Sequence, residues 1–363
     1  MGMPVKPHPF PPAVCSAISD ESRKKVRPMI RRSLVIAWMM VFMMAGPLTA
    51  TARGAEQAYL GIITGDLKST AYQIGMDLKA LLKRHNIHLS VFNSRGSVEN
   101  IYAVYQRPGN HLGLVQSDVL AFVAKVKTDH RLQLIADKIK WIYPLYDQEV
   151  HILASAKILS FGDLQGKRVA IGHVESGAYL TSLLLFEISG VSPGKLLTVD
   201  NSRALDELKA GNLDAIVVVD GSPVERLALD VSVNDGLHLL PVVYEGIRAF
   251  YPTTTIPAGT YPWQTTDVPT VSVKSVLVAY DFRNHHCRTI GTIAGLIRDN
   301  LDWLRFNGHP KWKTVDLNQA VKGWERYRCV EMAAAAPVIV EDEQEESRKP
   351  NPVADAIEAV FNP

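Results

Sequence analysis

The chain has few cysteines and almost no net charge. Its 363 residues include three cysteines, and 39 basic residues nearly balance 37 acidic ones, which leaves a formal charge of +2. Because a domain that binds nucleic acid usually carries a basic surplus, this balance argues against a nucleic-acid partner. The sequence also lacks a phosphate-binding loop, an HExxH zinc motif and a nucleophile elbow. It therefore predicts a protein that is not an enzyme and needs no cofactor.

Long apolar runs are missing after residue 52, and the run near the N-terminus has the order of a signal peptide. Residues 29–52 read MIRRSLVIAWMMVFMMAGPLTATA, with two arginines, an apolar core and an A-x-A end. This order is typical of a secretory signal peptide. A membrane anchor is the alternative, although the run is short and Gly46-Pro47 interrupts it. We expect residues 1–52 to be a leader and signal peptide, and the mature protein to be periplasmic or otherwise extracytoplasmic.

Two cysteines, Cys287 and Cys329, follow that segment. In an oxidising compartment two cysteines favour a disulfide, and two unpaired thiols are the alternative. His285 and His286 stand next to Cys287, but adjacent residues rarely fill one tetrahedral site, and no second ligand pair has zinc-like spacing. The sequence therefore predicts no metal site.

Short apolar runs alternate with amphipathic stretches along most of the chain, which favours parallel βαβ units and an α/β fold. Strands are predicted at 59–64, 88–93, 132–136, 150–154, 196–200, 213–220 and 274–281, and further strands follow a turn within 107–118 and a loop within 160–172. Helices are predicted at 70–85, 101–106, 118–127, 178–189, 202–212, 286–306 and 316–328.

The same strand-to-helix turn sequence occurs twice in the chain. GDLKSTAY at 65–72 and GHVESGAY at 172–179 have Gly, Ser, Ala and Tyr in identical places. RPGNHLGLVQSD at 107–118 and KAGNLDAIVVVD at 209–220 also align without a gap. Two correspondences in the same order indicate a duplicated βαβ architecture, with chance recurrence of common turn sequences as the alternative.

A duplicated architecture would place each turn at the carboxyl edge of a parallel sheet, where α/β proteins bind their ligands. Helix N-termini at such an edge expose unpaired N–H groups and the positive end of the helix dipole. Two facing turns of this kind predict a cleft that suits an anionic group.

Three further stretches resemble the TAXI family, the extracytoplasmic solute receptors of TRAP transporters. They are GSVENI at 96–101, LGLVQSD at 112–118 and TIPAGTYPWQTTDVPTV at 255–271. The resemblance implies a two-lobed periplasmic-binding-protein fold of type II, each lobe a mainly parallel sheet flanked by helices, with the ligand cleft between them. The predicted divisions are lobe 1 at 53–152 plus 252–330, lobe 2 at 153–251, and a disordered acidic tail at 331–363.

The resemblance implies capture of an organic anion or amino acid, such as glutamate or a dicarboxylate, for the membrane subunits of a TRAP transporter. The sequence departs from the family at three turn positions, where Lys68, Arg95 and Glu175 stand in place of the usual glycines. Glycine lets the backbone approach a ligand closely. A sensor or scaffold that has lost or changed its ligand is therefore the alternative function.

The candidate ligand contacts are residues at these turns and strand ends, and helix capping or packing is the alternative role for each. They are Lys68, Ser69, Thr70, Tyr72, Arg95, Ser97, Asn100, Gln116, Ser117, Asp118, Glu175, Ser176, Ala178, Tyr179 and Asp220. When the two turns are aligned, Lys68 falls opposite Glu175. We expect this pair either to meet across the cleft or to divide a zwitterionic ligand, with Arg95 beside Lys68; the alternative is that both side chains are solvated.

Overall fold

The computed structural model describes residues 59–125, 129–283 and 285–334, all of which belong to one compact unit. The predicted signal peptide lies outside the described residues, as does the predicted tail from residue 335 onward. Helix α11, Arg328–Ala334, shows that the start of the range predicted as a tail is helical instead.

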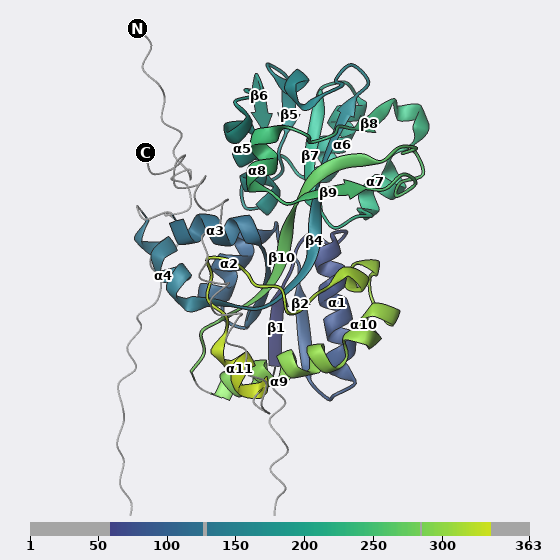
Figure 1. The fold of residues 1–363 in the computed structure, drawn as a ribbon. Coiled ribbons are helices and arrows are strands. Elements are labelled where there is room, and N and C mark those ends of the chain that lie inside the picture. Colours follow the sequence, from purple (N-terminus) through teal and green to yellow (C-terminus); the bar gives the residue numbers. More distant parts are fainter. Residues whose placement is uncertain (1–58, 126–128, 284, 335–363) are drawn as a thin grey trace, which may run out of the picture. The chain divides into compact units, whose positions relative to one another are not determined.

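Ten strands form one mixed sheet, with the order β2-β1-β3-β10-β4-β7-β5-β6 and with β8 and β9 added to β4 and β10 (Figure 1). The strands are β1 (Tyr59–Ile63), β2 (His88–Phe92), β3 (Leu112–Gln116), β4 (Ile139–Ser155), β5 (Arg168–Ala170), β6 (Lys195–Leu197), β7 (Ala215–Asp220), β8 (Leu237–Leu239), β9 (Thr253–Ile256) and β10 (Val268–Tyr280).

The sheet contains two parallel groups. Strand β1 pairs in parallel with β2 and β3, and β5 pairs in parallel with β6 and β7. We call these groups, with the helices between their strands, the first and second units. Helices and a mixed sheet confirm the predicted α/β class.

Helices α1 (Thr70–Lys83), α2 (Ser97–Gln106) and α3 (Ser117–Lys125) follow the strands of the first unit in turn. Helices α5 (Gly177–Ser189) and α6 (Asn201–Lys209) follow β5 and β6 in the second. The remaining helices are α4 (His130–Lys138), α7 (Glu225–Asp230), α8 (Glu245–Phe250), α9 (His285–Asp299), α10 (Leu301–Asn307) and α11, with short 3₁₀ turns at Phe161–Leu164, Val233–Asp235 and Pro310–Thr314.

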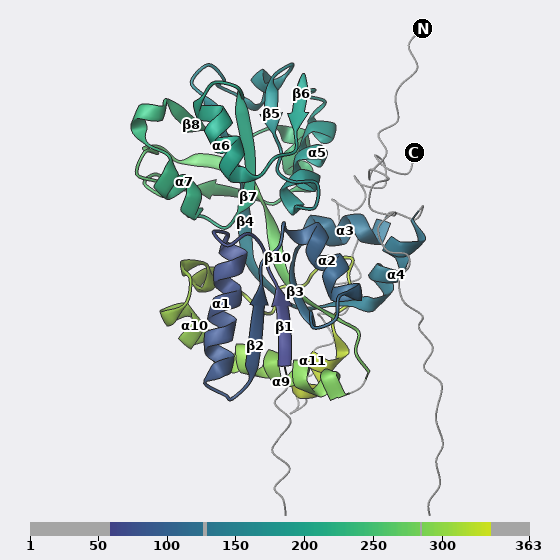
Figure 2. The ribbon, with the colours of Figure 1, turned by 180° about the vertical axis from the view of Figure 1, so that it is seen from behind.

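Two long antiparallel strands connect the units. Strand β10 pairs with β3 and with the first part of β4, and the second part of β4 pairs with β7 from Glu149↔Asp220 to Ala154↔Ala215. Figures 1 and 2 show β4 and β10 running from one unit into the other. One sheet therefore extends from the first unit into the second, although the β10–β4 ladder has register shifts between Lys274 and Val276 and between Leu277 and Val278.

The sequence pattern explains the two helices that follow the repeated turns. In α1, Ile74, Leu78, Leu81 and Leu82 are buried, a spacing that places them on one helical face. Helix α5 is apolar almost all round and is buried over most of its length, as expected for a helix enclosed on several sides.

Two predicted elements are wrong. Residues 132–136, predicted as a strand, lie in α4, where Asp129 caps the helix by accepting hydrogen bonds from the Arg131 and Leu132 N–H groups. Leu132 and Ile135 are buried one helical turn apart. The predicted helix at 316–328 is irregular up to Tyr327, and α11 begins only at Arg328.

The packing of β9 and the following loop differs from the predicted lobe boundary. Ile256, Tyr261, Trp263 and Val268 fall within the range predicted as lobe 1, but they share an apolar cluster with Leu227 and other residues of the second unit. The Trp263 indole donates a hydrogen bond to the Leu227 carbonyl at 2.7 Å. Large aromatic residues bury their area where the neighbouring core accepts it, so this segment belongs with the second unit.

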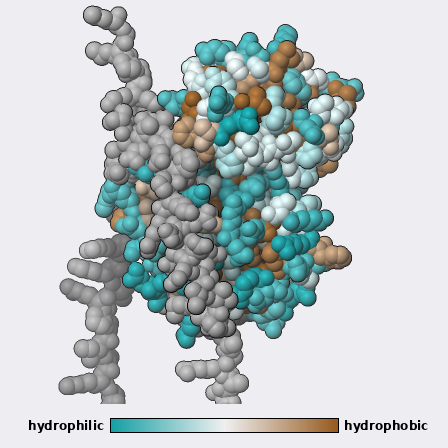
Figure 3. Space-filling view, in the orientation of Figure 1, coloured by the Kyte–Doolittle hydropathy of each residue, from teal (hydrophilic) through white to brown (hydrophobic). Residues whose placement is uncertain are grey.

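The described surface shown in Figure 3 is mainly hydrophilic, and its apolar atoms occur in small separate groups. Across the described residues, no helix combines the length and the apolar character that a membrane crossing requires.

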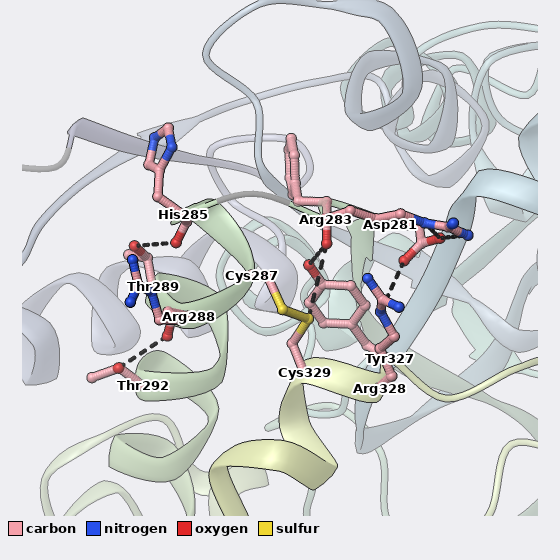
Figure 4. The surroundings of a disulfide bond; sticks show 11 residues. Asp281, Arg283, His285, Cys287, Arg288, Thr289, Thr292, Tyr327, Arg328 and Cys329 are labelled. Carbon is pink, nitrogen blue, oxygen red and sulfur yellow. Dashed lines mark hydrogen bonds and ion pairs between the residues drawn. A yellow bond between two sulfur atoms is a disulfide. The ribbon is translucent and has the colours of Figure 1, made fainter.

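A disulfide joins Cys287 at the start of α9 to Cys329 at the start of α11 (Figure 4). The two Cα atoms lie 5.5 Å apart, a usual separation for a disulfide. The neighbouring Tyr327 hydroxyl donates to the Phe282 carbonyl at 3.1 Å. The bridge and this hydrogen bond hold α11 against α9 and the segment before it.

Thiol labelling tests this bridge in the chain that begins at residue 53, which lacks Cys15. We expect no free sulfhydryl in the unfolded, unreduced protein. Because the bridge spans 42 residues, the chain-entropy model gives it about 3–4 kcal/mol. The Cys287→Ser/Cys329→Ser double variant should therefore unfold at a lower temperature. Complete labelling without a reductant would contradict the bridge.

Candidate functional site

A polar cavity of about 740 Å³ lies between the two units. Its first wall comes from the turns before α1 and α2 and from the end of β3, and its second wall comes from the turns before α5 and α6 and the end of β7. The lining residues are Thr64, Gly65, Asp66, Ser69, Ala71, Asn93, Ser94, Arg95, Gly96, Ser97, Glu99, Arg107, Leu114, Gln116, Gln148, Gly172, His173, Glu175, Ser176, Gly177, Ala178, Asp200, Asn201, Ser202, Val219, Asp220 and Arg226.

The repeated turns begin their helices in the same way. The Ser69 hydroxyl donates to the Asp66 carbonyl at 2.7 Å and accepts from the Tyr72 N–H at 3.2 Å. The Ser176 hydroxyl donates to the His173 carbonyl at 2.7 Å and accepts from the Tyr179 N–H at 3.1 Å. Both serines are therefore N-caps and also line the cavity. Helix capping and exposure to the cavity, which the sequence analysis set out as alternative roles, are thus combined in Ser69 and Ser176.

The N-terminus of α2 faces the N-terminus of α5 at close range. Gly96 precedes α2 with a φ of 130° and provides no side-chain cap. A Cβ at Gly96 would lie 3.0 Å from the Ser176 Cα and 3.4 Å from the Gly177 nitrogen. The Glu99 N–H donates to the Glu175 carbonyl at 3.1 Å. The two walls are thus in direct backbone contact at this point.

An ion pair crosses the cavity beside this contact. The Arg95 guanidinium lies 2.5 Å from the Glu175 carboxylate, and both side chains are partly exposed. Lys68 instead lies 3.8 Å from Asp230 of α7. The hypothesis that Lys68 meets Glu175 directly is therefore wrong. The alignment of the two turns correctly indicated that Lys68 and Glu175 reach across the cavity. Their partners are Asp230 and Arg95, however, and not each other.

The base of the cavity carries two buried amides. The Gln116 Nε2 donates to the Gln148 Oε1 at 2.7 Å, and both side chains are buried. The Gln116 Oε1 is buried without a hydrogen-bond partner. This oxygen lies against Gly177: a Cβ atom added at Gly177 would be only 1.7 Å from the Gln116 Oε1. The Gln116 side chain therefore extends from the end of β3 to the opposite wall.

Asp220, at the end of β7, is the second polar group of the base. Its carboxylate accepts hydrogen bonds from the Thr70 N–H at 3.1 Å and the Gly221 N–H at 2.8 Å. The Thr70 hydroxyl donates to the Gly221 carbonyl at 2.8 Å. Burial raises the pKa of Asp220 to about 6, against the opposing effect of these N–H donors. Asp220 therefore joins the two units and also lines the cavity.

The structure brings eight of the predicted site residues to the cavity wall and places seven elsewhere. The eight are Ser69, Arg95, Ser97, Gln116, Glu175, Ser176, Ala178 and Asp220. Of the others, Lys68 lines a small adjoining pocket, and Thr70 bonds to Asp220 and Gly221 as described. Tyr179 packs on the core, and Tyr72 is half-buried away from the lining.

Asn100, Ser117 and Asp118 make structural hydrogen bonds instead. The Asn100 amide is fully buried and donates to the Thr64 and Leu114 carbonyls, which ties two strand ends together. The Ser117 hydroxyl accepts from the Lys274 N–H at 3.0 Å. The Asp118 carboxylate accepts from the Thr181 hydroxyl at 2.6 Å, and burial raises its pKa to about 6. None of the three lines the cavity.

Sequence reasoning missed Gln148, Arg107 and Arg226, which all line the cavity. Gln148 lies in the middle of the long strand β4, where no turn or helix start marks it. Arg107 ends α2 and pairs with Glu99 at 2.9 Å. Arg226 lies in α7 and reaches Asp66 of the first unit at 3.8 Å. No local pattern could have identified Arg226, because its partner Asp66 lies 160 residues earlier in the sequence (226 − 66).

Comparison with known proteins identifies the family. Residues 62–324 match the model of the NMT1-like family. The chain belongs to the NMT1-like family. The matched range begins within β1 and contains every residue that lines the cavity.

Solved structures similar to this NMT1-like protein are distant in sequence. MatC from Rhodopseudomonas palustris with bound malate is 15% identical, with a TM-score of 0.47 over 83% of this chain and 98% of that one. An ancestral arginine-binding protein bound to arginine is 16% identical, with a TM-score of 0.44 over 70% and 95%. The arginine-, lysine-, histidine-binding protein ArtJ from Geobacillus stearothermophilus is 14% identical, with a TM-score of 0.43 over 71% and 95%.

The Gly96→Ala variant should hold the two walls apart. Its Cβ would meet the Ser176 backbone, which cannot give way as a flexible side chain can. Gly109→Ala is the matched control, because Gly109 also has a positive φ, of 84°, but has open space around its missing Cβ. Both variants should lose about 1–2 kcal/mol of stability from backbone strain. Only Gly96→Ala should increase the radius of gyration in small-angle scattering; equal scattering of the two variants would contradict the contact.

Charge exchange tests the Arg95–Glu175 pair. Arg95→Glu places two carboxylates against each other and should favour an open form, whereas Arg95→Glu with Glu175→Arg should restore the compact one. The exposed position limits the coupling energy to about 0.2–1 kcal/mol. Arg168→Glu is the control, because Arg168 pairs with Asp214 inside the second unit. Scattering that is identical for all variants would show that the pair has no role in closure.

Proposed function

We propose that this protein is an extracytoplasmic solute-binding protein that encloses a small organic solute between its two units. The observation that carries the proposal is the polar cavity, which receives helix N-termini from both walls. Its volume of about 740 Å³ is within the range usual for small-molecule sites. The mechanism is binding followed by closure, without a chemical step on the ligand.

The N–H groups at the starts of α1, α2, α5 and α6 favour an oxygen-rich group such as a carboxylate. No side chain caps α2 or α6, which leaves N–H groups at these helix starts for a ligand, but the Glu99 N–H of α2 already donates to the Glu175 carbonyl. We propose an amino acid or a small organic acid as the ligand class. Closure would be driven by contacts that the ligand makes with both walls at once.

The transport partner is proposed from the sequence resemblance. The motifs at 96–101, 112–118 and 255–271 resemble the TAXI receptors, which supports delivery to the membrane subunits of a TRAP transporter. The apolar segment at 29–52 supports export by a signal peptide and a periplasmic location. The lobe division proposed from the sequence is retained, with residues 253–268 moved to the second lobe because of their packing.

A sensor or scaffold without a ligand is the second candidate, and one observation favours it. Arg95 and Glu175 already satisfy each other across the cavity, so the walls can be held together without a ligand charge. In a transport receptor, the ligand would have to compete with or lie beside this pair.

Native mass spectrometry of the exported protein, purified without unfolding, separates the two candidates. A solute-binding protein should carry a small molecule that disappears on unfolding and refolding. The refolded protein should then show a higher unfolding temperature with one or more amino acids or organic acids. A protein with no retained mass and no such response would support the scaffold.

A further inference from the structure

Helix α7 of the second unit meets the turn before α1 through four charged side chains. Arg226 lies 3.8 Å from Asp66 of that turn, and Asp230 lies 3.8 Å from Lys68. Within α7, Arg226 also lies 3.7 Å from Asp230. Each unit contributes one cation and one anion, so both pairs between the units are attractive. We call these four residues the α7 clasp.

The attraction within the α7 clasp is mainly ionic. Its nitrogen–oxygen distances of 3.7 and 3.8 Å are longer than those of hydrogen bonds between such groups. The Lys68 and Asp230 side chains are 44% and 41% exposed, and the Asp66 side chain is 66% exposed. Dissolved salt screens the attraction between exposed charges, so the strength of the clasp depends on ionic strength.

Buried aromatic residues hold α7 to the second unit. The Val224 N–H, directly before α7, donates to the Tyr261 hydroxyl at 3.0 Å, and the Trp263 indole donates to the Leu227 carbonyl at 2.7 Å. The Tyr261 and Trp263 rings are buried and stack with their centroids 5.2 Å apart. The clasp residues of α7 therefore move with the second unit, and the clasp must break when the walls of the cavity separate.

A second ion pair joins the units on the other side. In both views, α7 and α1 lie on one side of the molecule, and α5 and α2 lie on the other (Figures 1 and 2). The pair of Arg95 and Glu175 stands just before α2 and α5. Asp66 and Arg226 of the α7 clasp line the cavity, as do Arg95 and Glu175. Charged side chains thus connect the two walls on both sides of the solute site.

We propose that the α7 clasp and the Arg95–Glu175 pair form an electrostatic latch that holds the two units closed, and that ionic strength regulates the opening of the cavity. The inference rests on the proposed function for the role of opening, which admits the solute, but every charge of the latch belongs to the protein itself. Three of these charges, on Lys68, Arg95 and Glu175, belong to residues predicted from the sequence as ligand contacts. The latch accounts for them without a ligand.

A latch of this kind increases the closed population before a solute arrives. A solute that binds the closed form then has less conformational work to do, and its apparent affinity increases with the closed fraction. Each exposed ion pair changes the ratio of closed to open molecules by roughly 1.5- to 5-fold. Three pairs between the units, acting together, should therefore change this ratio by at least about threefold.

Small-angle scattering of the refolded protein, with no solute added, tests the latch. Between about 20 mM and about 500 mM sodium chloride, the Debye length falls from roughly 20 Å to roughly 4 Å. The wild-type radius of gyration should increase over this range, because screening lowers the closed fraction. The Lys68→Gln/Arg95→Gln variant lacks one pair on each side. It should have a larger radius than the wild type at low salt and should respond less to added salt.

Arg168→Gln/Arg298→Gln is the matched control, because it removes the same charge from two ion pairs that do not connect the units. Arg168 pairs with Asp214 in the second unit, and Arg298 pairs with its neighbour Asp299 in α9. The control should scatter like the wild type at each salt concentration. A latch variant whose radius matches that of the control at low salt, or a wild-type radius that is independent of salt, would overturn the latch. Either result leaves the proposed function intact, which fails separately if no solute is retained or bound.

Discussion

The pairing of β4 with β10 and β7 is the constraint on which the site depends. Strand β4 has 17 residues and is hydrogen-bonded first to β10 and then to β7. It brings Gln148 and Glu149 to the junction of the two units, opposite Asp220. Because β4 and β10 connect the two units, we expect any separation of the cavity walls to involve bending at these strands.

Buried polar groups at the junction connect this constraint to the cavity. The Glu149 carboxylate accepts from the Ser222 N–H at 2.8 Å and pairs with the buried Lys311. His151 bonds to the Tyr261 hydroxyl at 2.8 Å, and burial lowers the pKa of His151 to about 4, so this histidine is neutral near pH 7. A buried ion pair gives weak evidence for stability. Its position here, where β4, the segment after β7 and the turn at Pro310–Thr314 meet, suits a role in fixing the geometry of closure.

The sequence was informative where local chemistry determines the structure. The Ser69 and Ser176 turns form the same N-cap, because Gly, Ser, Ala and Tyr recur at matching positions. It was misleading at 132–136, a predicted strand that lies in α4 behind the Asp129 cap. It could not give the partner of Glu175, because aligning two turns shows which residues are equivalent and not which ones meet. Likewise, the Thr70 N–H donates a hydrogen bond to the Asp220 carboxylate although the two residues are 150 positions apart in the sequence. No local sequence pattern specifies such a contact.

We propose that the two units enclose a small organic solute between facing helix N-termini. A crystal structure of the exported protein, purified without unfolding, tests it most directly. We expect density for a small molecule in the cavity, with oxygens near the start of α2 or α5. A closed cavity that contains only water, with the Arg95–Glu175 pair intact, would contradict it.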